Sequence, residues 1–85
     1  MTKTPSFAAL RQFLVDLGFT HGVVPGSHVY FEHPRSAALL VFRVLRDDEE
    51  VGATYLTMTR SVLDDFGIMD RKDFDNALRE RSLAV

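Results

Sequence analysis

The chain of 85 residues contains no cysteine, which excludes disulfide bonds, thiolate nucleophiles and zinc–thiolate sites. The lack also fits the cytoplasm, where thiols stay reduced, so we expect a cytoplasmic location. Long apolar runs are missing too, because the longest, residues 37–42, is far too short to span a membrane. No basic segment followed by a long apolar one stands at the N-terminus. We therefore expect neither a signal peptide nor a membrane partner.

The chain has no excess of positive charge, since its net charge is −2 at neutral pH. It is also unevenly distributed along the chain. Residues 1–46 carry five bases and two acids, whereas residues 47–85 carry five bases and ten acids. A polyanion would therefore meet the first half of the chain and be repelled by the second. The length predicts a single domain, residues 1–85, with a thin core.

Apolar residues at spacings of three and four predict a first helix, capped by Thr4 and with Pro5 at its first helical position. The apolar stripe comprises Phe7, Leu10, Phe13, Leu14 and Leu17. Gly18 is expected to end this helix in the left-handed conformation, with Phe19 folding back on it.

Residues 28–33 alternate between two sets of side chains, and this period of two predicts a half-buried strand. The inward set is expected to be Val29, Phe31 and His33, and the open-face set His28, Tyr30 and Glu32. The turn signal Pro25-Gly26-Ser27 precedes the strand, and Pro34 ends it.

Two more strands are predicted, a weak one over residues 19–24 and a third over residues 37–45. Both faces of the third strand are largely apolar, so we expect both to be covered. The helices would cover one face, and a second copy of the chain would cover the other.

The run of four acids in residues 46–50 is interpreted as a solvated loop, in which two acids also suit a helix N-terminus. A helix is predicted after it, from Val51 through Phe66, with Gly67 at its end. A short last helix is predicted to be capped by Asp70 and to fray after Arg79. Its buried side would be Phe74, Ala77 and Leu78. The fold class is thus α+β: a helix, a three-stranded antiparallel sheet, a helix and a short extra C-terminal helix.

Several short motifs together resemble the HicA family of bacterial toxin–antitoxin ribonucleases. They are Gly18-Phe19, Gly26-Ser27-His28, Phe31, His33-Pro34 and the pair Leu63 and Gly67-Ile68. The resemblance covers about residues 5–78 and implies a fold like that of double-stranded-RNA-binding domains. It also implies cleavage of mRNA, a cognate antitoxin as protein partner, and His28 as the catalytic residue. The acids of residues 47–50 depart from the family, whose members commonly carry a basic segment there.

RNA cleavage without a metal needs a base for the 2′-hydroxyl proton, and histidine suits this because its pKa lies near working pH. The predicted RNA-binding residues are Gly26, Ser27, Tyr30, Arg35 and Arg43. Tyr30 would stack on a base or simply pack on the sheet. The two arginines would contact phosphate or be ordinary surface residues.

No metal and no cofactor are expected, because the three histidines are scattered. His28 and His33 fall on opposite faces of one strand, and His33 is expected to be buried and bonded to backbone near Pro34. His21 carries no functional signal.

Two alternatives to an RNA-cleaving toxin remain open. One is a catalytically inactive HicA-like domain that binds a protein or forms a homodimer through the open sheet face. The acidic balance of the chain favours this alternative. The other is a DNA-binding regulator, which is weaker because no basic recognition helix is found.

Overall fold

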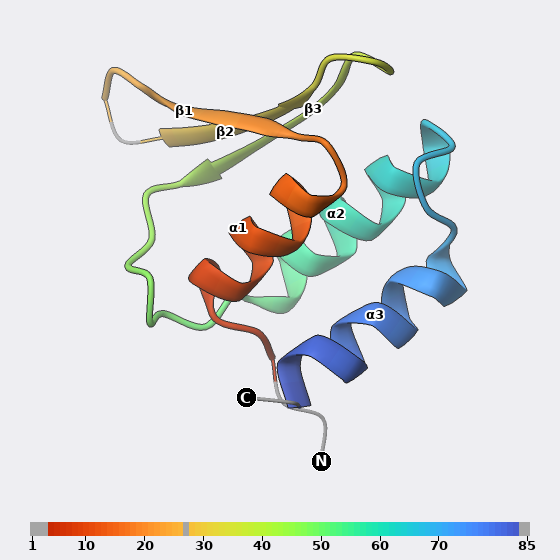
Figure 1. The fold of residues 1–85 in the computed structure, drawn as a ribbon. Helices are drawn as coiled ribbons and strands as arrows, with labels where there is room; N and C mark the ends of the chain where they lie inside the picture. The colour runs from red at the N-terminus through yellow and green to blue at the C-terminus, as the bar shows by residue number, and fades with distance from the viewer. Residues whose placement is uncertain (1–3, 27, 84–85) are drawn as a thin grey trace.

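The computed structural model describes residues 4–26 and 28–83, with side chains to residue 80. Figure 1 shows the order of the elements along the chain. They are α1 (Phe7–Asp16), β1 (Thr20–Val24), β2 (His28–His33), β3 (Ala38–Arg43), α2 (Ala53–Asp65) and α3 (Arg71–Leu83). This order confirms the predicted α+β layout.

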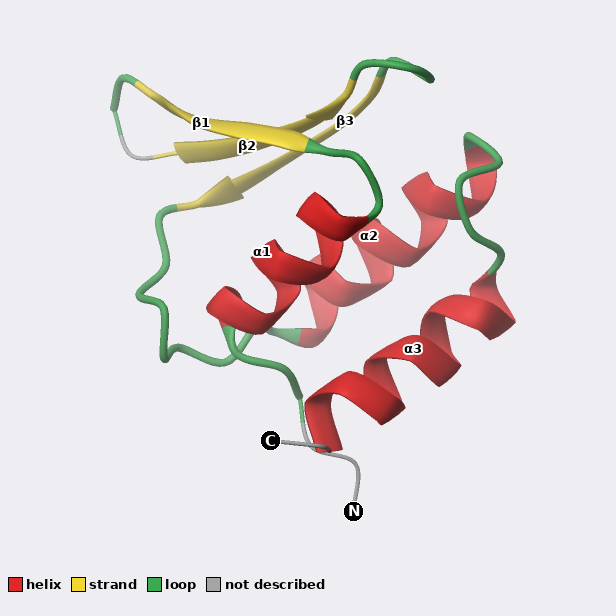
Figure 2. Cartoon of the chain, in the orientation of Figure 1, coloured by secondary structure: helices red, strands yellow, loops and turns green. Residues whose placement is uncertain are grey.

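The sheet forms one layer and the helices lie on one side of it, as Figure 2 shows. The strands are antiparallel in the order β1-β2-β3. Helix α3 packs on α2 and reaches α1 through a ring contact between Phe13 and Phe74, whose centroids are 5.8 Å apart. One face of the sheet is therefore left without a covering element in the described chain.

Helix α1 begins later than predicted, because Ser6 rather than Thr4 is its N-cap. The Ser6 hydroxyl accepts a hydrogen bond from the backbone N–H of Ala9, which satisfies a free donor of the first turn. Pro5 lies before the helix, where its carbonyl accepts from the N–H of Val51. The prediction of Thr4 as cap and Pro5 as first helical residue is therefore wrong.

The end of α1 agrees with the sequence. Gly18 has a φ of +102°. Its N–H donates to Val15, and the N–H of Phe19 donates to Leu14. These two bonds form a Schellman motif, in which the residue after the glycine returns to the helix. Phe19 is buried, as predicted.

Strand β3 has one face covered by the helices, and the cover of its other face by a second copy of the chain stays a prediction. Ala38, Leu40 and Phe42 are buried, whereas Leu39 and Val41 are 54% and 42% exposed. The reason is that every described helix lies on the same side of the sheet. The strand is also shorter than predicted, since it ends at Arg43.

Two predictions for the C-terminal half are also wrong. Val51 is buried but precedes α2, which has Gly52 as its N-cap. Helix α3 extends further than predicted, because it continues past Arg79 to Leu83 through residues with no glycine or proline among them. Its predicted cap is confirmed, since the Asp70 carboxylate accepts from the N–H of Asp73 at 2.8 Å.

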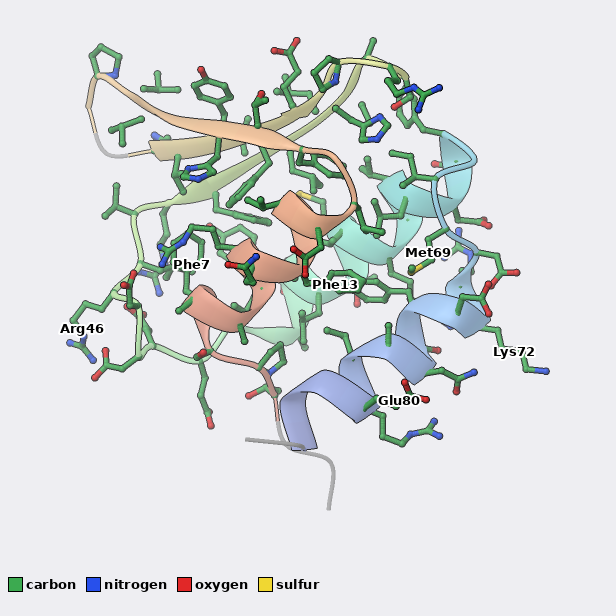
Figure 3. All side chains as sticks on the ribbon, in the orientation of Figure 1. Phe7, Phe13, Arg46, Met69, Lys72 and Glu80 are labelled. Atoms are coloured by element: carbon green, nitrogen blue, oxygen red, sulfur yellow. The ribbon has the colours of Figure 1, made fainter. Side chains whose placement is uncertain are left out.

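The core lies between the sheet and the helices, and a cluster of phenylalanines stands at its centre. The Phe31 ring is fully buried and lies edge-on to Phe7 at 6.2 Å and tilted against Phe42 at 5.6 Å. Figure 3 shows Phe7 on the side of α1 that faces the sheet. Most of the predicted inward residues of α1 and β2 belong to this core.

Two positions with positive φ predict opposite effects on stability. At Gly18 an added Cβ would meet Nε2 of His33 at 3.3 Å, and Ala37 already has a φ of +65°. Gly18→Ala is expected to lower the free energy of unfolding by about 1–2 kcal/mol, because L-residues are strained in this region. Ala37→Gly is expected to raise it by up to about 1 kcal/mol, since the relieved strain exceeds the added chain entropy. Urea denaturation followed by circular dichroism measures both, and equal signs would contradict the argument.

Candidate nucleic-acid interface

The face of the sheet that no described helix covers is made of three cross-strand rows. We call it the open sheet face. The rows, read from β1 to β3, are Val24–His28–Arg43, Gly22–Tyr30–Val41 and Thr20–Glu32–Leu39. The predicted open-face residues of β2 are all in it, and the expected alternation is confirmed by their burial.

His28 is exposed and is the first residue of β2. Val24 is its cross-strand partner on one side and Arg43 on the other. Directly opposite residues have Cβ atoms about 5 Å apart, so the side chains of His28 and Arg43 begin side by side on this face. No hydrogen bond to the His28 side chain is found within the described residues. The imidazole is thus accessible at a corner of the open sheet face.

Tyr30 occupies the centre of the open sheet face, and its ring lies over Gly22. A Cβ on Gly22 would come within 2.7 Å of the Tyr30 hydroxyl oxygen and 2.8 Å of ring atom Cε1. The glycine therefore leaves room for the ring to lie along the sheet. The ring is half-buried, and its position is about 7 Å from His28 along the strand.

Arg43 is held at the edge of the open sheet face by an ion pair. Its guanidinium donates to Glu49 at 2.8 Å, and its backbone N–H donates to the Tyr55 hydroxyl at 3.2 Å. Two hydrogen bonds lower the pKa of Glu49 below its ordinary value. The bond from the Arg43 guanidinium has the larger effect, and the bond from the Arg46 backbone N–H has the smaller.

The acidic loop (residues 46–50) is largely exposed, as the sequence indicated, and it also bonds to the start of α1. Glu49 and Asp47 accept hydrogen bonds at their carbonyl oxygens from the N–H groups of Phe7 and Ala8. The loop thereby supplies acceptors to the first turn of α1, whose N–H groups have no partner inside the helix. Its side chains also form ion pairs with arginines, such as the pair between Asp47 and Arg11 at 2.9 Å.

Arg35, the other predicted phosphate contact, lies far from the corner of the open sheet face that His28 occupies. Arg35 lies in the turn between β2 and β3, at the opposite end of the strand from His28 (Figure 1). The strand between them is about 17 Å long at the usual rise per residue. Arg35 instead lines a cavity of about 400 Å³ near His33 and Phe66.

The turn that precedes His28 is described only in part. Gly26 has a φ of +121°, a conformation that favours glycine, and an added Cβ would meet nothing within 4 Å. Ser27, the other predicted phosphate donor in this turn, lies outside the described residues.

His33 is buried, as predicted, and has two hydrogen-bond partners. Its Nε2 lies 3.1 Å from the carbonyl oxygen of Leu17, and its Nδ1 lies 2.9 Å from the Ser36 hydroxyl. A carbonyl only accepts, so Nε2 donates. The backbone partner is in the α1 end rather than near Pro34. His33 thus joins the end of α1 to the turn after β2.

His21 is exposed on the other side of the sheet, with its ring 5.6 Å from that of Phe31. In the part of the chain that the structure describes, no three His, Cys, Asp or Glu side chains form a group that could hold a metal ion. The described helices also include none with the length and apolar character needed to cross a membrane.

Comparison of the chain with protein-family models, with curated proteins and with solved structures finds no match. The case for a function therefore depends on the motifs and on the geometry of the open sheet face.

Sequence reasoning missed two features of this face. The first is the space that Gly22 leaves for the Tyr30 ring. It was missed because a glycine in a strand can also mark a bulge or a bend. The second is the ion pair between Arg43 and Glu49. Spacing rules predict ion pairs only between residues of a helix or of paired strands, and Glu49 belongs to a loop.

Proposed function

We propose that this protein is a HicA-like RNA-binding endoribonuclease that cleaves mRNA in the cytoplasm without a metal or cofactor. The observation that carries the proposal is the exposed His28 at one corner of an open sheet face, beside Arg43 and one row from Tyr30. The helix–sheet–helix order that the resemblance implies supports it as well.

The chemistry follows from these side chains. His28 as neutral imidazole removes the proton of a 2′-hydroxyl, whose oxygen then attacks the adjacent phosphorus. The bond from phosphorus to the 5′-oxygen breaks, and that oxygen takes a proton from water. The products are a 2′,3′-cyclic phosphate and a 5′-hydroxyl. Arg43 neutralises the phosphate charge, and Tyr30 stacks on a neighbouring base.

The proposal includes a protein partner. An antitoxin that covers His28 would block access to the open sheet face. Exposed Leu39 and Val41 offer such a partner apolar contact area on the same face.

Incubation of the purified protein with total RNA in the presence of a metal chelator tests the proposed activity. We expect cleavage to proceed unchanged with the chelator and to yield fragments ending in a 2′,3′-cyclic phosphate. Fragments that end in a 3′-hydroxyl, or cleavage that stops when the chelator is added, would contradict a mechanism based on His28.

A second candidate is a catalytically inactive module that binds a protein or a second copy of the chain through the same face. The observation that favours it is the pairing of Arg43 with Glu49, which already balances the charge of that arginine. A well-folded protein that leaves RNA intact, and whose mass in light scattering doubles with concentration, would support this candidate over the ribonuclease.

A further inference from the structure

We propose that Glu49 competes with RNA for Arg43, so that the acidic loop limits how tightly the open sheet face binds its substrate. This inference rests on the proposed function and concerns the regulation of the same site. The contact that carries it is the 2.8 Å ion pair between the Arg43 guanidinium and the Glu49 carboxylate.

The ion pair lies next to the proposed catalytic histidine. Arg43 is the cross-strand partner of His28, so its guanidinium is the described positive group that emerges closest to the imidazole in the sheet register. A phosphate whose neighbouring 2′-hydroxyl reaches His28 would be within range of this guanidinium. Glu49 thus holds the same cation that the substrate would use.

Glu49 is firmly placed within the acidic loop. Its backbone N–H donates to Arg46 at 3.1 Å and its carbonyl accepts from Phe7 at 2.8 Å. Its second carboxylate oxygen accepts from the Arg46 N–H at 3.2 Å. The side chain of Glu49 is 28% exposed, compared with 83% for Asp48 in the same loop. Glu49 is therefore preorganised for Arg43, whereas Asp48 is largely solvated and pairs instead with Arg46, at 3.2 Å.

Carboxylate and phosphate are interchangeable partners for a guanidinium. The oxygens of both accept charge-assisted hydrogen bonds from it, so one can replace the other. RNA that binds must first break the ion pair, and the freed carboxylate then repels the phosphate. An exposed ion pair of this kind is worth enough to lower affinity by about two- to fivefold.

The test compares Glu49→Gln with Asp48→Asn, because each removes one negative charge from the same loop. The glutamine side chain in the first variant keeps an oxygen for the Arg46 N–H, so the loop is expected to fold alike, which circular dichroism checks. The probe is a short single-stranded RNA of mixed sequence with every 2′-hydroxyl methylated, which cannot be cleaved. Fluorescence anisotropy at low salt measures its binding to the full chain.

We expect Glu49→Gln to tighten binding about two- to fivefold more than Asp48→Asn does. In an Arg43→Ala background the gain from Glu49→Gln should be no larger than that from Asp48→Asn, since the cation for which Glu49 competes is gone. Equal gains in the presence of Arg43, or a Glu49→Gln gain that still exceeds that of Asp48→Asn after Arg43→Ala, would overturn this inference and leave the proposed function standing. Failure of every variant to bind the probe would overturn both.

Discussion

Replacement of His28 by alanine is expected to lower the rate of RNA cleavage by about 10²- to 10⁴-fold, the usual contribution of a positioned general base. The free energy of unfolding should change little, because His28 is exposed and no described residue hydrogen-bonds its side chain. Single-turnover cleavage of a labelled RNA measures the rate, and thermal unfolding checks the fold.

His21→Ala is the matched control, since His21 is also an exposed strand histidine but lies on the opposite side of the sheet. We expect the His21→Ala variant to cleave RNA at a rate within about twofold of that of the unchanged chain. The reason is that a group far from the reacting atoms takes part in no proton transfer. Growth arrest on induced expression gives a second comparison of the same pair. Arrest or cleavage that survives His28→Ala would mean that the catalytic residue lies elsewhere.

Phe31→Ala is expected to lower the free energy of unfolding by about 3–5 kcal/mol, because it removes a buried ring and leaves a cavity. Phe31 is fully buried and contacts the rings of Phe7 and Phe42. Small domains have a total stability of about 5–15 kcal/mol, so this variant should be near the limit of folding. Chemical denaturation followed by far-ultraviolet circular dichroism measures the change.

Phe66→Ala provides the control of the same chemistry, since the Phe66 side chain is 48% exposed at the end of α2. We expect a loss below about 1 kcal/mol, as for most partly exposed sites. A Phe66→Ala loss as large as that of Phe31→Ala would show that the aromatic cluster under the sheet is not the main source of stability.

The parts of the fold that local patterns determine could be predicted from the sequence. The alternation in residues 28–33 identified the buried and open faces of β2, because a strand has a period of two. Gly18 marked the end of α1 for a similar reason, since a left-handed residue there favours glycine. Asp70 likewise marked the start of α3.

The errors arose where contacts between residues far apart in the sequence determine the structure. Ser6 rather than Thr4 caps α1, and residues 47 and 49 supply acceptors to its first turn from a loop far along the chain. For the candidate site, the sequence indicated His28 and Tyr30 through the strand period. It was silent about Glu49, whose approach to Arg43 depends on a loop.

The bond between the first turn of α1 and the loop after β3 has a consequence for synthesis. The N–H of Phe7 has its acceptor at Glu49, so this N–H gains its protein partner only after the loop has left the ribosome. The basic half of the chain emerges first, and the acids that pair with Arg11 and Arg43 follow it. A nascent chain that stops before residue 47 therefore carries its arginines unneutralised. The finished loop ends this exposure and at the same time supplies two backbone acceptors to the first turn of α1.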